Sequence, residues 1–173
     1  MSARPSFFVS ETESPLGTLT IVTTERGICH LHFGPINEAS LNAKLKKMGL
    51  KPDWTYCTER TSLACKQLHE YFNGTRSQFD IDIDLHGSPF QKKVWEALRQ
   101  IEYGETRSYK EIAQEIGAPK AVRAVGGANN RNPIPIIIPC HRVIGSNGAM
   151  VGYGGGVKKK ELLLNLEGCK QIS

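Results

Sequence analysis

The chain has 173 residues, 39% of them hydrophobic and 23% charged, so it can bury a core without help from a metal or disulfides. Its formal charge of +5 favours an anionic partner, although dedicated nucleic-acid-binding tails carry more charge. The sequence shows no apolar stretch long enough for a secretory signal or a membrane span, and its five cysteines form no C-x-x-C pair. We therefore expect a cytoplasmic protein with reduced thiols.

The first half of the chain, residues 1–86, is predicted to be an α/β domain with a small antiparallel sheet. Short runs of β-branched and aromatic residues, separated by turn residues, indicate strands. Apolar residues at helical spacing indicate helices between them. The expected strands are residues 7–9, 19–22, 28–33 and 79–85, and the expected helices are residues 38–48 and 61–72.

The second half, residues 87–173, is predicted to be mostly helical, which makes the whole chain a two-domain α+β protein. Ser88 with Gln91, and Ser108 with Glu111, have the spacing of capping boxes at helix starts. Two short helices across a tight turn suggest a helix-turn-helix, although any pair of antiparallel helices gives a similar pattern. The expected helices are residues 89–101, 109–116, 120–129 and 158–166.

Cys140 is the candidate nucleophile. It follows the apolar run of residues 134–138, which is predicted to be a buried strand that ends at the cysteine. A nucleophilic cysteine needs a base or a positive charge nearby to form its thiolate, and His141 and Arg142 come directly after it. The alternative is that Cys140 is a small hydrophobic core residue.

The second half resembles the O6-alkylguanine-DNA alkyltransferases in six motifs that occur in the same order over about eighty residues. The resemblance implies a DNA-binding and catalytic domain in residues 87–173, and in the first half it extends only to the order of elements. The motifs are Ser108-Tyr109, Arg123-Ala124-Val125-Gly126, Asn132-Pro133, Pro139-Cys140-His141-Arg142-Val143, Gly152-Tyr153-Gly154-Gly155-Gly156 and Glu167-Gly168.

The resemblance implies a chemical role for four residues. Cys140 matches the thiolate that takes the alkyl group from O6 of guanine in double-stranded DNA and keeps it, so that each protein molecule reacts once. His141 matches a histidine that removes the thiol proton through a water, and Glu167 matches the acid that orients this histidine, which is the logic of cysteine and serine hydrolases. Asn132 matches an asparagine that fixes the cysteine loop; from the sequence alone, it is equally well a turn residue before proline.

The resemblance also implies that the damaged base is flipped out of the duplex, since an alkyl carbon inside the stack cannot reach a buried thiolate. Arg123 matches the arginine that fills the vacated space, and Tyr109 matches the tyrosine that crowds the adjacent phosphate. The small residues Ala121, Ala124 and Gly126 would let the helix backbone approach the minor groove closely. Without the resemblance, Arg123 is better read as a solvated helix charge and Tyr109 as an aromatic in a capping turn.

Three residues match the wall of the family's guanine pocket: Pro135, Tyr153 and Gly154. Some relatives have serine at the position of Gly154, so a hydroxyl contact to O6 is in doubt here and the pocket is expected to accept bulkier alkyl groups. We expect no cofactor and no metal, because Cys29, His30 and His32 have the spacing of strand residues rather than of a zinc site. Lys158, Lys159 and Lys160 are interpreted as a solvent-facing helix start.

Two other functions fit parts of the pattern. A cysteine hydrolase would use Cys140 with a histidine, but a matching histidine motif elsewhere in the chain does not stand out. A helix-turn-helix regulator would bind DNA without catalysis, and such regulators usually dimerise to match paired half-sites, whereas we expect a monomer. The sequence leaves open the preferred alkyl group and whether O4-alkylthymine is also a substrate.

Overall fold

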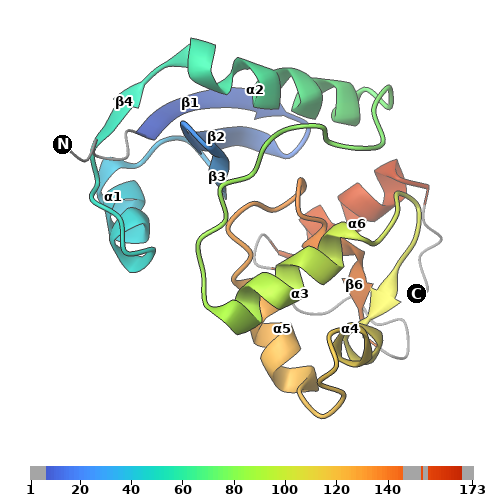
Figure 1. Ribbon diagram of the computed structural model, residues 1–173. Coiled ribbons are helices and arrows are strands. Elements are labelled where there is room, and N and C mark those ends of the chain that lie inside the picture. Colours follow the sequence, from blue (N-terminus) through green and yellow to red (C-terminus); the bar gives the residue numbers. More distant parts are fainter. Residues whose placement is uncertain (1–6, 146–152, 154–155, 169–173) are drawn as a thin grey trace. The chain divides into compact units, whose positions relative to one another are not determined.

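The computed structural model describes residues 7–145, 153 and 156–168, and the chain divides into two compact units, residues 1–86 and 87–173 (Figure 1). The first unit has a small mixed sheet with helices, and the second is mainly helical. The predicted fold class is therefore confirmed. Each unit is described by itself below.

The sheet of the first unit has the strand order β3-β2-β1-β4. Strands β1 (Phe7–Ser14), β2 (Gly17–Thr24) and β3 (Gly27–Phe33) form the predicted antiparallel meander, and each is longer than or equal to the expected run. The prediction of a purely antiparallel sheet is wrong, because β4 (Trp54–Tyr56) pairs with β1 in parallel. A run of three residues is too short to show the alternation typical of a strand, so β4 can be recognised only by its pairing with β1.

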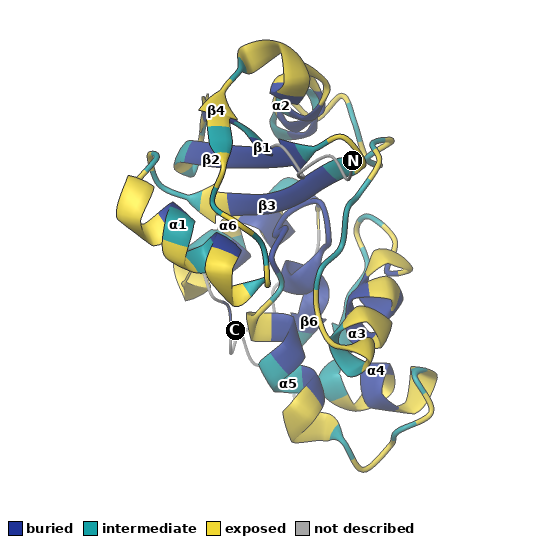
Figure 2. Ribbon diagram, turned by 60° about the vertical axis from the view of Figure 1, so that its left-hand side comes forward, coloured by how far each residue is buried: buried dark blue, intermediate teal, exposed yellow. Residues whose placement is uncertain are grey.

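The two helices of this unit cover opposite faces of the sheet. Helix α1 (Glu38–Lys47) contributes Leu41 and Leu45 to an apolar core with Phe7 and Val9. Helix α2 (Thr58–Phe72) packs on the other face, where alternate residues of β1 contact it through hydrogen bonds such as that of Thr12 with His69 (2.7 Å). Figure 2 shows the strands largely buried between helices whose outer sides are exposed.

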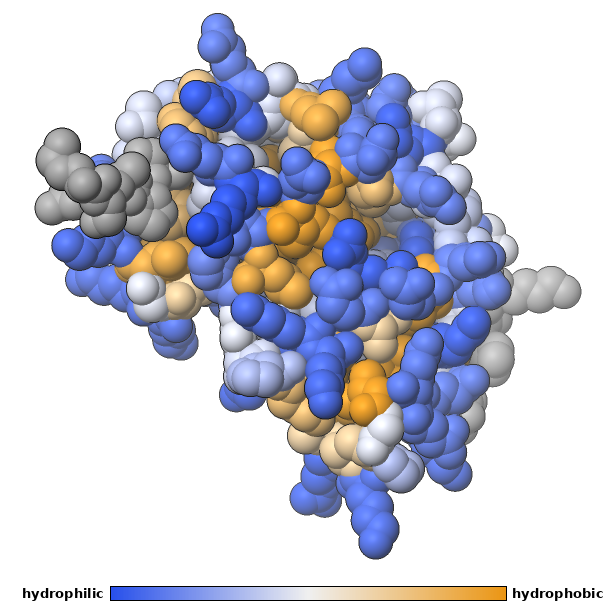
Figure 3. All heavy atoms as spheres, viewed as in Figure 1, coloured by the Kyte–Doolittle hydropathy of each residue, from blue (hydrophilic) through white to orange (hydrophobic). Residues whose placement is uncertain are grey.

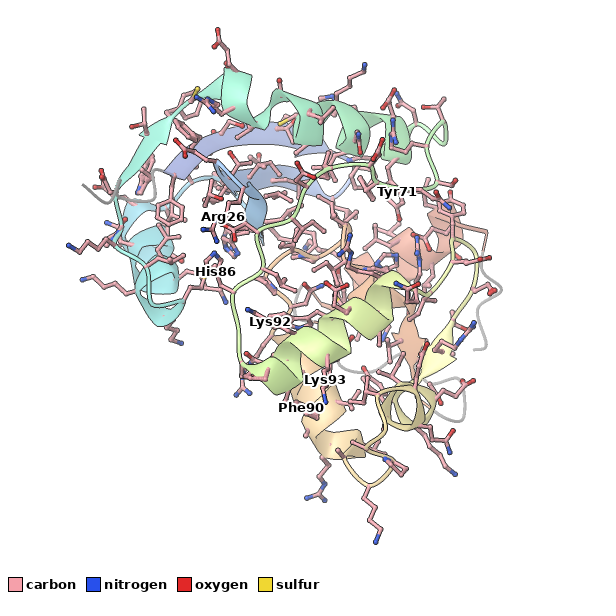
Figure 4. The ribbon with its side chains drawn as sticks, viewed as in Figure 1. Arg26, Tyr71, His86, Phe90, Lys92 and Lys93 are labelled. Atoms are coloured by element: carbon pink, nitrogen blue, oxygen red, sulfur yellow. The ribbon has the colours of Figure 1, made fainter. Side chains whose placement is uncertain are left out.

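Residues 79–85 do not form the predicted strand. Only a single bridge links Ile83 to Ile28 at the start of β3. Phe79 packs against the ring of Tyr71 of α2, and Tyr71 is labelled in Figure 4. A Cβ atom at Gly27 would lie 2.3 Å from the carbonyl oxygen of Asp82, so this close crossing requires glycine. The alternation of residues 79–85 therefore reflects an extended segment with one buried side, not a full strand.

The second unit is built on α3 (Pro89–Arg99), α4 (Tyr109–Glu115), α5 (Val122–Asn130) and α6 (Val157–Leu166). Both predicted capping boxes are present, at Ser88 and at Ser108. The indole nitrogen of Trp95 donates to the carbonyl of Ala128 (2.8 Å) and ties α3 to α5. Two short parallel strands, β5 (Arg107–Ser108) and β6 (Val143–Ile144), bring the start of α4 next to the chain that follows the cysteine.

Residues 134–138 form a buried turn, not the predicted strand. The amide of Ile138 donates to the carbonyl of Ile134 (2.9 Å), and Ile136 between them has a φ of 74°. A left-handed backbone at a β-branched residue costs about 1–3 kcal/mol and persists only where its surroundings impose it. Cys140 consequently starts a short 3₁₀ helix, η1 (Cys140–Arg142), instead of ending a strand.

Figure 3 shows that most of the side chains projecting from one face are hydrophilic. In the described part of the chain, no helix is both long and apolar enough to cross a bilayer.

Candidate active site around Cys140

Cys140 is buried, with 4% of its surface exposed. Burial raises the pKa of its thiol to about 11, although a hydrogen bond from Asn132, the charge of Lys160 and two backbone amides act in the opposite direction. Burial thus favours the neutral thiol in the resting protein. Any reaction at this sulfur requires that its proton be removed in the site.

Asn132 holds the turn before the cysteine from both sides. Its amide nitrogen donates to the carbonyl of Ile138 (2.8 Å), and its oxygen accepts from the amide of Ile134 (3.0 Å). The same side chain hydrogen-bonds the Cys140 thiol in a way that favours the thiolate. One asparagine thus fixes the strained turn and contacts the reacting atom.

Glu167 binds two neighbouring side chains of η1. Its Oε2 lies 2.7 Å from Nε2 of His141, and its two oxygens accept from Nε and a terminal nitrogen of Arg142 at 2.8 and 3.0 Å. Burial alone would raise the pKa of Glu167, but the hydrogen bonds and charges of His141 and Arg142 outweigh it and lower the pKa to about 2. The carboxylate is therefore ionised, and another nitrogen of Arg142 is held by the carbonyl of Ile101 (2.6 Å).

His141 has one ring nitrogen engaged and one available. Burial lowers its pKa, so the ring is neutral, while the bond to Glu167 acts in the opposite direction. With its proton on Nε2 facing the carboxylate, Nδ1 carries a lone pair. Nδ1 is buried and has no hydrogen-bond partner in the described part of the chain. Nδ1 can therefore accept a proton.

Lys160 does not face solvent as the sequence was interpreted; it is fully buried. Its ammonium group donates to the carbonyl of Val143 (2.5 Å) and lies 5.9 Å from the ring centroid of Tyr109. Burial lowers its pKa to about 8, and the charge of Cys140 acts against that shift. The interpretation fails because Val157 begins α6 so that Lys158 stays exposed while Lys160 turns inward.

Tyr109 connects the start of α4 to the cysteine region. Burial raises its pKa, followed by the charge of Cys140, while a hydrogen bond with Asn129 acts in the opposite direction. Its ring lies 4.0 Å from where a Cβ atom at Gly126 would stand, so α5 approaches it closely. Asn129 also donates a long hydrogen bond to the carbonyl of Cys140 (3.4 Å). Tyr109 is thus part of the same environment as the thiol.

The other residues matched to DNA contacts lie on the outside of α5. Arg123 and Ala124 are exposed, and Ala121, which precedes the helix, is half-buried. In the described part of the chain, they do not take part in the hydrogen-bonded cluster around Cys140.

Of the three residues matched to the guanine pocket, two are described by the structure. Pro135 is buried in the strained turn, and Tyr153 is 8% exposed. Burial raises the pKa of Tyr153 well above its ordinary value, and the charges of Cys140 and Glu167 raise it further, so its hydroxyl belongs to the same site. Gly154 lies outside the described residues.

Sequence reasoning missed two contributors to this site, Lys160 and Ile136, and did not predict that Arg142 binds Glu167. Arg142 stood in the quoted motif, but only the folded 3₁₀ turn directs it to Glu167 together with His141. Nothing in the sequence distinguishes Lys160 from the two lysines before it. The described residues contain no group of three or more histidine, cysteine or acidic side chains that could hold a metal.

Comparison with family models matches both halves of the chain. Residues 89–169 match the model described as 6-O-methylguanine DNA methyltransferase, DNA binding domain. Residues 8–85 match the model described as 6-O-methylguanine DNA methyltransferase, ribonuclease-like domain. The two matches together cover nearly the entire chain.

Two relatives and one solved structure are similar to this chain over most of its length. The methylated-DNA–protein-cysteine methyltransferase of Methanosarcina barkeri is 50% identical over 90% of this chain and 93% of its own length. The constitutive enzyme of that name from Bacillus subtilis is 44% identical, with 92% and 94% of the two chains covered. The crystal structure of Mycobacterium tuberculosis OGT in complex with DNA is similar with a TM-score of 0.80 and 44% identity, covering 94% of this chain and 92% of that one.

Proposed function

The chain belongs to the 6-O-methylguanine DNA methyltransferase family, and on this premise we propose that it moves an alkyl group from O6 of guanine in DNA to the sulfur of Cys140. One observation carries the proposal. A buried thiol is followed directly by a neutral histidine whose Nε2 is held by Glu167 and whose Nδ1 lacks a partner in the described part of the chain. This is the arrangement that a cysteine needs to lose its proton only when it reacts.

The reaction balances without a cofactor. The thiol proton passes through a water to Nδ1 of His141, and Glu167 stabilises the imidazolium that forms. The sulfur lone pair attacks the alkyl carbon, the new S–C bond forms and the C–O6 bond breaks. The electron pair of the broken bond stays on the guanine, which takes up one proton and is restored. Cys140 becomes a thioether with no ionisable proton, so the protein is consumed in a single turnover.

Two further groups support the thiolate as it forms. Lys160 places a buried positive charge near the sulfur, and Asn132 donates a hydrogen bond to it. In a site with little water, a fixed charge and a fixed hydrogen-bond donor stabilise an anion far more than they would at the surface. They counter part of the effect of burial, which still raises the pKa of Cys140 in the resting protein.

We propose that the damaged nucleotide is rotated out of the duplex to reach this buried sulfur. Arg123 is exposed at the start of α5, where it can enter the space that the base leaves. Tyr109, packed against Gly126, stands at the junction between α5 and the thiol. The small side chains of Ala121, Ala124 and Gly126 support close approach of α5 to the minor groove.

The substrate range is proposed to extend beyond methyl groups, because Gly154 removes a side chain from the matched pocket wall. O4-alkylthymine offers the same C–O bond on a smaller base and is the second substrate to test. The protein is proposed to act as a monomer in the cytoplasm, where reducing conditions keep Cys140 as a thiol.

The proposal is tested by intact mass and peptide mapping after the protein is mixed with duplex DNA containing O6-methylguanine. We expect one methyl group on Cys140, restored guanine, and no transfer by Cys140→Ser. Tight DNA binding with no change in protein mass would contradict transfer and favour a DNA-binding regulator. A methyl group on another cysteine would contradict the assignment of the acceptor.

A further inference from the structure

The first unit contains a pocket that the reaction at Cys140 does not use. It lies between the sheet and α1 and has a volume of about 350 Å³, the lower end of the range for small-molecule sites. Thr20 of β2 and His30 and His32 of β3 line it from the sheet. Thr20 pairs with His32 across the two strands, so these side chains share one face.

His30 lies on the same face of β3 as His32, because it pairs with Val22 just as His32 pairs with Thr20. The register of β2 and β3 shifts between Val22 and Thr23, so that Cys29 is the additional residue on β3. Cys29 belongs to the apolar core beneath α1, and His30, which follows it, lines the pocket next to that core. His30 therefore supplies a mostly buried imidazole to the lining of the pocket.

The wall formed by α1 is positively charged. Lys44 and Lys47 stand three residues apart on the helix and both line the pocket. Burial lowers the pKa of Lys44, and the neighbouring charge of Lys47 lowers it further. Like charges at this spacing repel each other. None of the nine residues that line the pocket is acidic, so nothing in its lining compensates the two ammonium groups.

Neutral donors complete the lining. Asn37, the N-cap residue of α1, accepts a hydrogen bond from the amide of Ser40 through its side-chain oxygen (2.9 Å). Its side-chain nitrogen carries two hydrogens that it can donate. The hydroxyl of Ser40 adds another donor. Two ammonium groups, two imidazoles and these donors form a set that suits an anion with several oxygens.

We propose that this pocket binds the terminal phosphate group of a small phosphorylated molecule. A phosphomonoester is a dianion with three acceptor oxygens, which matches two lysines and several donors. A terminal phosphate can enter a concave site. A phosphodiester within a strand is less suited to it, because the nucleic-acid chain continues on both sides of the phosphate. The ligand would relieve the repulsion between Lys44 and Lys47 by lying between them and the imidazoles of His30 and His32.

The test is a heteronuclear NMR titration of the full chain in buffer free of phosphate and sulfate. The probes are inorganic phosphate, deoxyguanosine monophosphate, and a short single-stranded oligonucleotide without terminal phosphates. We expect saturable shifts at Thr20, His30 and Ser40 with the first two probes. The double variant Lys44→Gln/Lys47→Gln should weaken this binding by at least about tenfold, and Lys44→Gln alone by less.

Lys46→Gln is the matched control, because this exposed lysine lies on the same helix but does not line the pocket. It should leave the affinity for both phosphate probes unchanged, and thermal unfolding should show all variants folded. Equal weakening by Lys46→Gln and the double variant would overturn the proposal in favour of unspecific attraction. An absence of saturable shifts would overturn it outright, and stronger shifts with the oligonucleotide would assign the pocket to a DNA strand instead.

Discussion

Nε2 of His141 lies 2.7 Å from Oε2 of Glu167, and both side chains are completely buried. The same carboxylate also neutralises Arg142, which donates to both of its oxygens. A single acidic group therefore sets the tautomer of a proposed base and compensates a buried guanidinium. Its removal has consequences for stability and for chemistry that can be measured separately.

Glu167→Gln should destabilise the protein and slow transfer while DNA affinity stays nearly unchanged. The variant keeps the shape of the side chain but leaves Arg142 buried without its counter-charge, a change that costs about 3–5 kcal/mol of unfolding free energy. Glu96→Gln is the control, because its pair with Arg99 is exposed and contributes about 0–1 kcal/mol. The measurements are chemical denaturation, single-turnover transfer and DNA binding. Equal losses of transfer and DNA affinity would contradict the assigned role of Glu167.

The stability of the protein should fall in acid because of the same residue. The pKa of Glu167 is lowered to about 2 in the folded chain, against an ordinary value of 4.5. A lowered pKa means that the ionised carboxylate stabilises the fold above about pH 4.5 and that this contribution is lost as the pH falls towards about 2. Denaturation curves over this range should show the loss in the wild type and a smaller slope in Glu167→Gln. Identical slopes would show that the ionisation of Glu167 is not coupled to folding.

His141→Gln should change the pH dependence of transfer as well as its rate. In the wild type, a base inside the site takes the proton of Cys140, so the rate should be nearly constant around neutral pH although the pKa of the thiol is about 11. Without the base, the thiolate must form by loss of the proton to solvent. The rate of the variant should then be lower by a factor of about 100 or more and rise about tenfold per pH unit. A parallel decrease at every pH would argue against a role for His141 as base.

Lys160→Met should make Cys140 less acidic and slow transfer, since it removes the buried charge that favours the thiolate. Lys158→Met is the matched control, because Lys158 is exposed at the start of the same helix. The reaction of Cys140 with a small alkylating reagent across pH reports its pKa directly, and that pKa should rise only in Lys160→Met. A slower transfer rate with an unchanged pKa would indicate that Lys160 only holds Val143 in place.

Arg123→Ala should impair repair of duplex DNA by about 10-fold or more and leave reaction with free O6-benzylguanine nearly unchanged. The reason is that Arg123 is exposed on α5 and does not take part in the cluster around the thiol. Arg131→Ala removes an exposed positive charge at the other end of the same helix and controls for general DNA attraction. Transfer rates on both substrates distinguish the two effects. Equal loss on duplex and free base would exclude a role in flipping.

The features that could be predicted from the sequence are those encoded locally. Both capping boxes depend on residues three apart, Ser88 with Gln91 and Ser108 with Glu111, and both helices begin where the pattern indicates. The first three strands are runs of β-branched and aromatic residues that end at turn residues, so they could also be predicted. The parallel strand Trp54–Tyr56 was missed because it is defined by a partner about 47 residues away, Phe7–Val9, and not by its own pattern.

The apolar run of residues 134–138 was predicted as a strand because hydrophobicity reports burial and not backbone conformation. The left-handed φ of Ile136 contradicts the preference of its own side chain, and the hydrogen bonds of Asn132 hold the turn in spite of it. Lys160 was likewise misread, because three consecutive lysines give no indication of which one turns inward. Both errors concern residues whose conformation is imposed by contacts distant in sequence, and both lie in the site.

The burial of Cys140 also bears on how long an unused molecule stays competent. Oxidants and stray electrophiles in a cell react with thiolates far faster than with thiols. Because Cys140 is only 4% exposed and its thiol has a pKa of about 11, it presents almost no thiolate to them. For a protein proposed to react only once, any such side reaction would be final. The burial that raises the pKa of Cys140 therefore also protects the thiol from side reactions until a damaged nucleobase enters the site.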